Sequence, residues 1–301
     1  MYTRLLIPLD GSKTAEKVLP YARFLAGAFK LPVELMAVID IAEMAAHLAA
    51  ERAAHIDTMI EEGMRSSQEY LKRVATSFPG LKVDCTVEKG KAADAIVERG
   101  ETDKGALITM ATHGRSGVNR WLLGSVAEKV LRSTTNPLLL VRAGEQAKSE
   151  GEATLKSIVV PLDGSELAEG ALPAVAELAK KLDLGIVLFR AYHIPYNVYG
   201  DGDGYSAVNI ESLIAEVRDE AQSYLEKKTA ELKKQGFGEV SSIAKEGFSG
   251  DEIIKLAHET PNGLIAMCSH GRSGIKRWVL GSVTETVVRH SEDPVLIVRA
   301  G

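Results

Sequence analysis

Two short segments of the chain carry the residue types of an anion-binding loop. His113–Val126 reads HGRSGVNRWLLGSV, and 157 residues later (270 − 113) His270–Val283 reads HGRSGIKRWVLGSV, with three differences in 14 positions. Packing alone would not need both copies to keep the same glycines, arginines and serines, because cores tolerate exchanges among apolar residues. A glycine-rich loop that leads into a helix offers free backbone N–H groups and a positive dipole end to phosphate. The repeat therefore predicts phosphate binding.

Each residue type in this loop has a physical use. Gly114 and Gly117 let the backbone approach a ligand closely, and Ser125, where the next helix begins, is expected to act as its N-cap or as a hydroxyl donor. Trp121 and Trp278 are interpreted as apolar anchors, and His113 and His270 as hydrogen-bonding residues that order the loop. The loop cations available to a phosphate are Arg115, Arg120, Arg272, Lys276 and Arg277.

Asp10 and Asp163 follow the first apolar run of each copy, and each is followed by Gly-Ser. One interpretation is a carboxylate that orders its own loop or caps a helix. The other is a carboxylate that accepts hydrogen bonds from the base or ribose of a nucleotide, or contacts its metal. Both remain open at this point.

Composition limits the classes of protein. The 301 residues suffice for two domains of ordinary size, and the net charge of −5 argues against a general binder of nucleic acid or membrane surfaces. The two cysteines, Cys85 and Cys268, form no CxxC pair, so a structural zinc site is not expected. No apolar run is long enough to cross a bilayer and no signal peptide is evident, which makes the cytoplasm the expected location.

The repeat extends over most of the chain. Leu5–Ser12 matches Ile158–Ser165, and Asn136–Arg142 matches Asp293–Arg299. The polar stretch Gly144–Thr154 is suited to a linker. We therefore expect two domains, residues 1–144 and 155–301.

Within each copy, short apolar runs alternate with longer helical patterns. The helices expected in the first copy are Lys13–Ala28, Ala42–Ser77, Ala92–Glu101 and Ser125–Ser133. The strands expected between them are Arg4–Leu9, Val33–Ile39, Lys82–Val87, Ala106–Ala111 and Leu138–Arg142. This alternation predicts the α/β class, as two tandem, doubly wound domains with five-stranded parallel sheets. Such sheets bind ligands beyond the carboxyl ends of their strands, where Asp10, Val38 and the segment from Ala111 to Gly114 would meet.

In these features the chain resembles the universal stress proteins. That family carries the signature Gly-x2-Gly-x9-Gly-(Ser/Thr) after the fourth strand and an aspartate after the first. Here Gly114 is followed by nine residues and then Gly124-Ser125, and Gly271 by nine residues and then Gly281-Ser282. The signature's first glycine is replaced by Ala111 in one copy and by Cys268 in the other.

The resemblance implies the fold of adenine nucleotide alpha hydrolase-like domains, related by a pseudo-two-fold axis, with ATP and Mg²⁺ bound in each. Its strand-end contacts to the nucleotide, on the adenosine side and from the fourth strand, would be Pro8, Asp10, Val38, Met110, Ala111, Pro161, Asp163, Ala191, Met267 and Cys268. Its phosphate contacts would be Gly114, Gly124, Ser125, Val126, Gly271, Gly281, Ser282 and Val283. It also implies that Leu138–Arg142 and Val295–Arg299 pair and join the two halves, with a homodimer as a further assembly.

Three functions remain open. The first is a nucleotide-dependent regulator of the stress response with protein partners still to be found. The second is a slow ATPase or phosphotransferase that uses the same site, although no base and nucleophile are evident beyond Asp10 and no GxxxxGK(S/T) motif occurs. The third is a dimerisation module that binds no nucleotide. A dedicated enzyme with its own catalytic residues is not predicted, and the metal ligands are left open.

Overall fold

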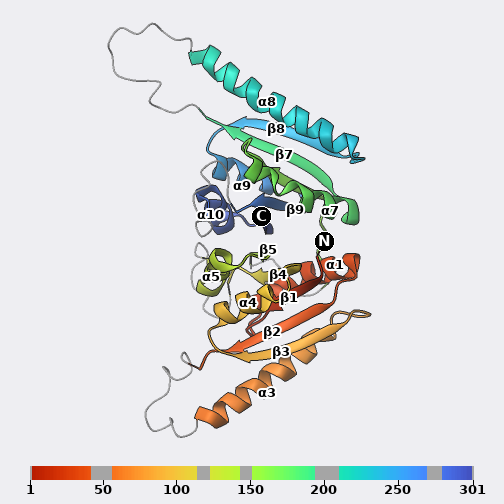
Figure 1. Ribbon diagram of the computed structural model, residues 1–301, viewed down its shortest axis with the longest axis vertical. Coiled ribbons are helices and arrows are strands. Elements are labelled where there is room, and N and C mark those ends of the chain that lie inside the picture. Colours follow the sequence, from red (N-terminus) through yellow and green to blue (C-terminus); the bar gives the residue numbers. More distant parts are fainter. Residues whose placement is uncertain are drawn as a thin grey trace, which may run out of the picture. The chain divides into compact units, whose positions relative to one another are not determined.

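The computed structural model describes residues 2–41, 56–113, 123–142, 151–193, 210–269 and 280–299. The described residues form two compact units (Figure 1). The first contains residues up to Thr154 together with Pro294–Arg299, and the second contains Leu155 to Asp293. Gly114, Gly271, both tryptophans and His270 lie outside the described residues.

The first unit alternates strands and helices. Its elements are β1 (Arg4–Pro8), a 3-10 helix (Ala15–Val18), α1 (Leu19–Phe29), β2 (Val33–Ile39), α3 (Ile56–Ala75), β3 (Val83–Lys89), α4 (Ala92–Glu101), β4 (Ala106–Ala111), α5 (Ser125–Ser133) and β5 (Leu138–Val141). The strand order is β3-β2-β1-β4-β5, and these strands pair in parallel. The predicted class, and all five predicted strands to within two residues at each end, are confirmed.

The central strand shows why the apolar runs form a covered sheet. Leu5 of β1 lies opposite Val33 of β2 on one side and Leu107 of β4 on the other. Leu5, Leu6 and Ile7 are completely buried, as expected for strands covered on both faces. The helix α3 packs along β2 and β3 (Figure 1).

The helix expected at Lys13–Ala28 is divided. Ala15–Val18 form a 3-10 turn and α1 begins at Leu19, with Pro20 at its second position. Proline has no N–H to donate and a fixed φ, both of which suit the first turn of a helix. The second unit repeats this arrangement with α6 (Glu166–Glu169) and α7 (Leu172–Leu182).

The second unit follows the same plan. Its further elements are β6 (Ser157–Pro161), β7 (Gly185–Tyr192), α8 (Ile210–Lys234), β8 (Val240–Glu246), α9 (Ser249–Glu259), β9 (Gly263–Cys268) and α10 (Ser282–His290). Its strands have the order β9-β6-β7-β8 and pair in parallel. The last strand, β10 (Val295–Val298), is grouped with the first unit, where it runs antiparallel to β5 with Leu296 opposite Leu139.

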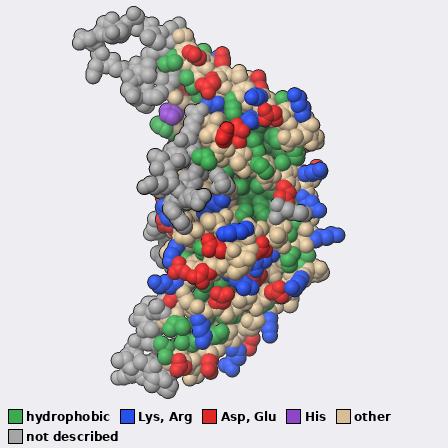
Figure 2. All heavy atoms as spheres, viewed as in Figure 1, with side chains coloured by type: hydrophobic (Ala, Val, Ile, Leu, Met, Phe, Trp, Pro, Cys, Tyr) green, Lys and Arg blue, Asp and Glu red, His purple; other side chains and the backbone are tan. Residues whose placement is uncertain are grey.

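The surface agrees with the modest net charge. Acidic and basic side chains are interspersed over the face shown in Figure 2. None of the described helices is long and apolar enough to span a membrane.

Candidate functional site

The aspartates after the first strands build their own turns. Asp163 Oδ1 accepts hydrogen bonds from the backbone N–H of Ser165 at 2.9 Å and from its hydroxyl at 2.6 Å. Asp10 Oδ1 accepts in the same way from the backbone N–H of Ser12 at 2.9 Å. The glycine between the two residues has a φ of 82° in the first copy and 86° in the second, a region that disfavours side chains with a Cβ.

The serine of each turn continues this chain of bonds into the following helix. Ser165 Oγ accepts from the backbone N–H of Ala168 at 3.2 Å, and Ser12 Oγ from that of Ala15 at 3.1 Å. The loop-ordering interpretation of the two aspartates therefore has direct structural support. The same hydrogen bonds hold the carboxylate in one place at the end of the strand, and a ligand-binding carboxylate also requires a fixed position.

In both copies a tyrosine from the long helix interacts with a glutamate in the helical turn that follows the aspartate, and sequence reasoning missed it. Tyr224 of α8 donates to Glu169 Oε1 at 2.7 Å, and Lys228 Nζ lies 2.8 Å from Glu169 Oε2. Burial and the Glu169 carboxylate raise the pKa of Tyr224 above its usual value. Tyr70 of α3 is the counterpart, with a pKa raised by burial and by Glu16 and Asp10.

The glycine-serine pairs begin the helices α5 and α10, as the sequence predicts. Gly124 and Gly281 are the N-cap residues, and Ser125 and Ser282 are the first helical residues. The N-cap role considered for Ser125 is therefore wrong, because Gly124 occupies that position, with extended backbone and no side-chain cap. The hydroxyl-donor alternative stays a prediction. The first N–H groups of a helix have no partner within it, so both helices can donate to an anion.

In each copy, a backbone hydrogen bond links the start of this helix to the residue that follows the fourth strand. The N–H of Gly124 donates to the carbonyl oxygen of Thr112 at 2.9 Å, and that of Gly281 to Ser269 at 3.0 Å. Next to this bond, Thr112 Oγ1 lies 3.0 Å from His113 Nδ1. That contact agrees with a loop-ordering role for His113.

The residues that replace the signature's first glycine are buried at the strand ends. Ala111 is 6% exposed and Cys268 is 4% exposed. Burial, and to a smaller extent the charge of Asp163, raise the pKa of the Cys268 thiol to about 11. A Cβ added to Gly170, after α6, would lie 3.3 Å from Cys268 Sγ, so the thiol packs against this backbone.

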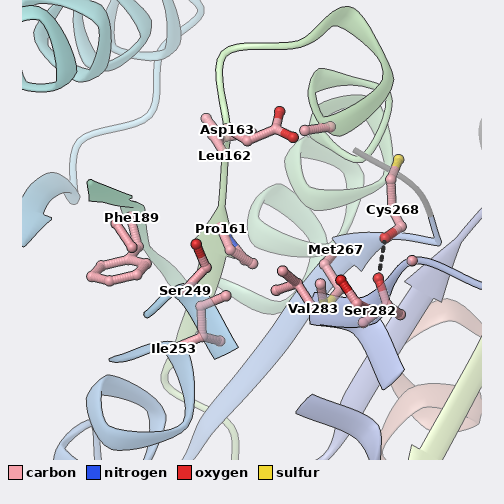
Figure 3. A pocket seen from close by; sticks show the side chains of 14 residues that line it. Pro161, Leu162, Asp163, Phe189, Ser249, Ile253, Met267, Cys268, Ser282 and Val283 are labelled. Carbon is pink, nitrogen blue, oxygen red and sulfur yellow. Dashed lines mark hydrogen bonds between the residues drawn. The ribbon is translucent and has the colours of Figure 1, made fainter. Parts of the chain in front are cut away.

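In the second unit, the ends of β6, β7 and β9 and the starts of α9 and α10 line a cavity of about 250 Å³ (Figure 3). Eight predicted residues line it, namely Pro161, Asp163, Ala191, Met267, Cys268, Gly281, Ser282 and Val283. Further lining residues that the sequence reasoning did not name are Leu162, Ala168, Phe189, Ser249, Ile253 and Thr284. Ser249 and Ile253 come from α9, and the signal that could have pointed to this helix is the repeated glycine before it, Gly90 in the first copy and Gly247 in the second.

The corresponding positions of the first unit stand on equivalent elements. Pro8 ends β1, Val38 lies near the end of β2, and Met110 and Ala111 end β4. Gly124, Ser125 and Val126 begin α5. Among the described residues, no group of three histidine, cysteine, aspartate or glutamate side chains could hold a metal ion.

The chain contains two doubly wound α/β domains, and the second has a cavity at its strand ends, where folds of this class bind ligands. The model of the universal stress protein family matches residues 1–142 and again 154–299. The chain belongs to this family, as a tandem of two of its domains.

Comparisons with individual proteins support the same family assignment. A universal stress protein of Methanocaldococcus jannaschii is 32% identical over 154 residues, which cover 48% of this chain and 94% of that protein. One of Mycolicibacterium smegmatis is 22% identical over 298 residues, covering 98% of this chain and 96% of the relative. The crystal structure of one from Archaeoglobus fulgidus shares the fold, with a TM-score of 0.69, 22% identity and coverage of 99% of this chain and 98% of that one.

Proposed function

We propose that each half of this chain binds ATP with Mg²⁺, and that the protein acts as a nucleotide-dependent regulator in the stress response. The functional domains are residues 1–144 and 155–301. The observation that carries the proposal is the cavity of the second unit, where Asp163, the end of β9 and the start of α10 meet.

The cavity has the polarity that a nucleotide needs. One wall is the N-terminus of α10, where Ser282 and Val283 present backbone N–H groups and the positive end of the helix dipole to phosphate. Another wall is apolar, with Phe189, Ala191 and Ile253. A pocket that is mostly apolar with a few placed polar groups is typical of small-molecule and cofactor sites, and a nucleotide offers both an apolar base and charged phosphates.

Asp163 suits the ribose in this arrangement. Its carboxylate lines the cavity, and Ser165 holds its Oδ1 in place through two hydrogen bonds. A fixed carboxylate accepts hydrogen bonds from sugar hydroxyls without a further entropic cost of ordering. Mg²⁺ would be held mainly by phosphate oxygens, as is usual for this ion. The loop cations Arg272, Lys276 and Arg277 lie outside the described residues, and their phosphate contacts stay a prediction.

Binding rather than turnover is the better-supported activity. Phosphoryl transfer needs a positioned nucleophile as well as charge stabilisation. In the described part of the second unit, the carboxylate that lines the cavity is Asp163, and Ser165 already engages one of its oxygens. A slow ATPase remains the alternative, and a dimerisation module without nucleotide is disfavoured by the cavity.

Calorimetry with MgATP tests the proposal. We expect up to two sites per chain in the wild type, the loss of one in Gly124→Val or Gly281→Val, and no binding in the double variant. Denaturation of freshly purified protein should release an adenine nucleotide. Unchanged affinity in a folded double variant would overturn the loop assignment. Rapid hydrolysis that disappears in Asp10→Ala plus Asp163→Ala would favour the ATPase.

The remaining expectations from the sequence and from the resemblance stay predictions. They are a cytoplasmic location, the joining of the two halves through their last strands, a homodimer, and protein partners that respond to the bound nucleotide.

A further inference from the structure

The cavity of the second unit is lined by a serine whose matching position in the first copy carries no hydroxyl group. Ser249 is the first residue of α9 and lines the cavity. The matching position in the first copy, 157 residues earlier (249 − 157), is Ala92, the first residue of α4. The Ser249 hydroxyl makes no hydrogen bond with any other residue that the structure describes.

The backbone places Ser249 and Ala92 in the same way. The N–H of Gly247 donates to the carbonyl oxygen of Tyr192 at 2.9 Å, and the N–H of Gly90 to that of Ile39 at 3.0 Å. Both glycines have a positive φ, 148° and 141°. In each copy, therefore, the same turn places the start of this helix (α4 or α9) next to the end of the second strand. The backbone is alike at Ala92 and Ser249, and the two positions differ in the hydroxyl group.

A small residue brings the start of α9 close to α10. A Cβ added to Gly250 would lie 2.7 Å from Cγ2 of Thr286, so only glycine fits between the two helices without a shift. This approach places Ser249 on the wall of the same cavity that the first residues of α10 line.

Ser249 lies at the end of the cavity away from Ser282. Figure 3 shows it grouped with Phe189 and Ile253, whereas Ser282 and Val283 lie on the other side. Phe189 is 1% exposed and Ile253 is 2% exposed, whereas Ser249 is partly exposed, so a ligand can reach its hydroxyl beside these apolar side chains. If phosphate occupies the start of α10, the apolar end with Ser249 receives the base.

From this arrangement we infer that Ser249 is a base-recognising residue of the second domain, which hydrogen-bonds the polar edge of the purine and gives this domain a contact that the first domain lacks. The inference rests on the proposed nucleotide binding. A serine hydroxyl can donate one hydrogen bond and accept others, so it can pair with a ring nitrogen or an exocyclic amino group. The contact should strengthen the binding of adenosine and of ATP equally, and it should not affect the affinity for a ligand without a base.

The test uses Cys268 as a reporter, because this thiol lines the cavity of the second unit. The rate of its alkylation by N-ethylmaleimide in the full chain is followed by mass spectrometry while adenosine, ATP or inorganic tripolyphosphate is added. In Ser249→Ala, which copies Ala92, we expect the half-protecting concentrations of adenosine and ATP to rise about fivefold, the effect of one neutral hydrogen bond. That of tripolyphosphate should not change.

Two controls separate the outcomes. Ser241→Ala removes an exposed serine of β8 and should leave all three concentrations unchanged. Equal protection of wild type and Ser249→Ala by adenosine would overturn the inference alone, and an equal shift for tripolyphosphate would overturn it in favour of a structural role. If calorimetry detects no nucleotide binding to the wild type, the proposed function and this inference both fail.

Discussion

The backbone N–H of Gly124 donates to the carbonyl oxygen of Thr112 at 2.9 Å, and a Cβ on Gly124 would lie 3.0 Å from that same oxygen. Gly124 has a φ of −61°, which any residue can adopt. The glycine is therefore needed for the close approach of two backbone segments. This contact links the end of β4 to the first turn of α5, where phosphate is expected.

We predict that Gly124→Ala lowers the free energy of unfolding by about 1–3 kcal/mol, because the added methyl group overpacks against backbone that cannot move freely. It should also weaken ATP binding to the first domain, since α5 must shift. Chemical denaturation and calorimetry measure the two effects.

Gly27→Ala is the matched control for this variant. Gly27 lies within α1, and its added Cβ would meet no atom within 4 Å. Alanine is the better helix former, so stability should rise by about 0.5–1 kcal/mol. Equal losses in both variants would contradict the contact described above.

Asp293→Asn should stabilise the protein at neutral pH. Burial raises the pKa of Asp293, so its charged form is disfavoured in the folded state. The residue at the matching position, Asn136, donates from its Nδ2 to the carbonyl oxygens of Asp103 at 2.8 Å and Ala106 at 3.1 Å. Asparagine at position 293 removes the charge and offers such a donor, with a gain of about 1 kcal/mol.

The stability gained by Asp293→Asn should depend on pH in a definite direction. A carboxyl group whose folded-state pKa is raised stabilises the fold when protonated, and that contribution is lost as the pH rises through the folded-state pKa. The advantage of Asp293→Asn should therefore be full at pH 7 and shrink as the pH falls toward 4. Thermal unfolding of both proteins across this range measures it, and a gain that grows on acidification would refute the assignment.

Cys268 should be a slow nucleophile that ATP protects. With a pKa of about 11, its thiol is almost entirely protonated at neutral pH, and the thiolate is the reactive form. We expect the alkylation rate to climb about tenfold per pH unit between 7 and 10. Cys85, which is partly exposed and lies on β3, is the internal reference, and its rate should not respond to ATP. Fast labelling of Cys268 at pH 7 would contradict its burial.

The first domain should depend on a buried ion-pair network at Glu34. This side chain is 4% exposed and pairs with Arg4 and with Arg99. Glu34→Ala leaves the Arg4 side chain, which is 16% exposed, with the longer ion pair to Asp103 at 3.7 Å, and should cost about 3 kcal/mol. The double variant Arg4→Ser plus Glu34→Val copies the matching residues of the second copy, Ser157 and Val187, and should lose much less.

An exposed ion pair provides the comparison for Glu34. Glu128 and Arg132 form an i,i+4 pair on α5 with side chains 34% and 39% exposed. Glu128→Ala should cost about 0.3–0.5 kcal/mol, because water screens such pairs. Urea denaturation ranks the three variants, and a loss for the double variant as large as for Glu34→Ala would show that the pairing itself, rather than the stranded charge, stabilises this domain.

The sequence by itself determined the helices and strands, and it identified those site residues that occur in both copies. Runs of buried apolar residues such as Leu5–Ile7 specify strands locally, and the internal repeat marked Asp10, Asp163, Gly124 and Gly281 because the same chemistry appears twice. These signals are readable since they depend on neighbours in the chain. The helix that begins at Leu19 shows the limit, because Pro20 placed its start later than the apolar spacing indicated.

Only the tertiary structure decided which further residues line the cavity of the second unit. Phe189 comes from β7 and Ser249 and Ile253 from α9, and the strand order β9-β6-β7-β8 brings them to one cavity with α10. No local spacing encodes that meeting, because it depends on how separate elements pack around the sheet. The physical cost of a Cβ at Gly124 or Gly250 is likewise set by atoms distant in the sequence, Thr112 in one case and Thr286 in the other.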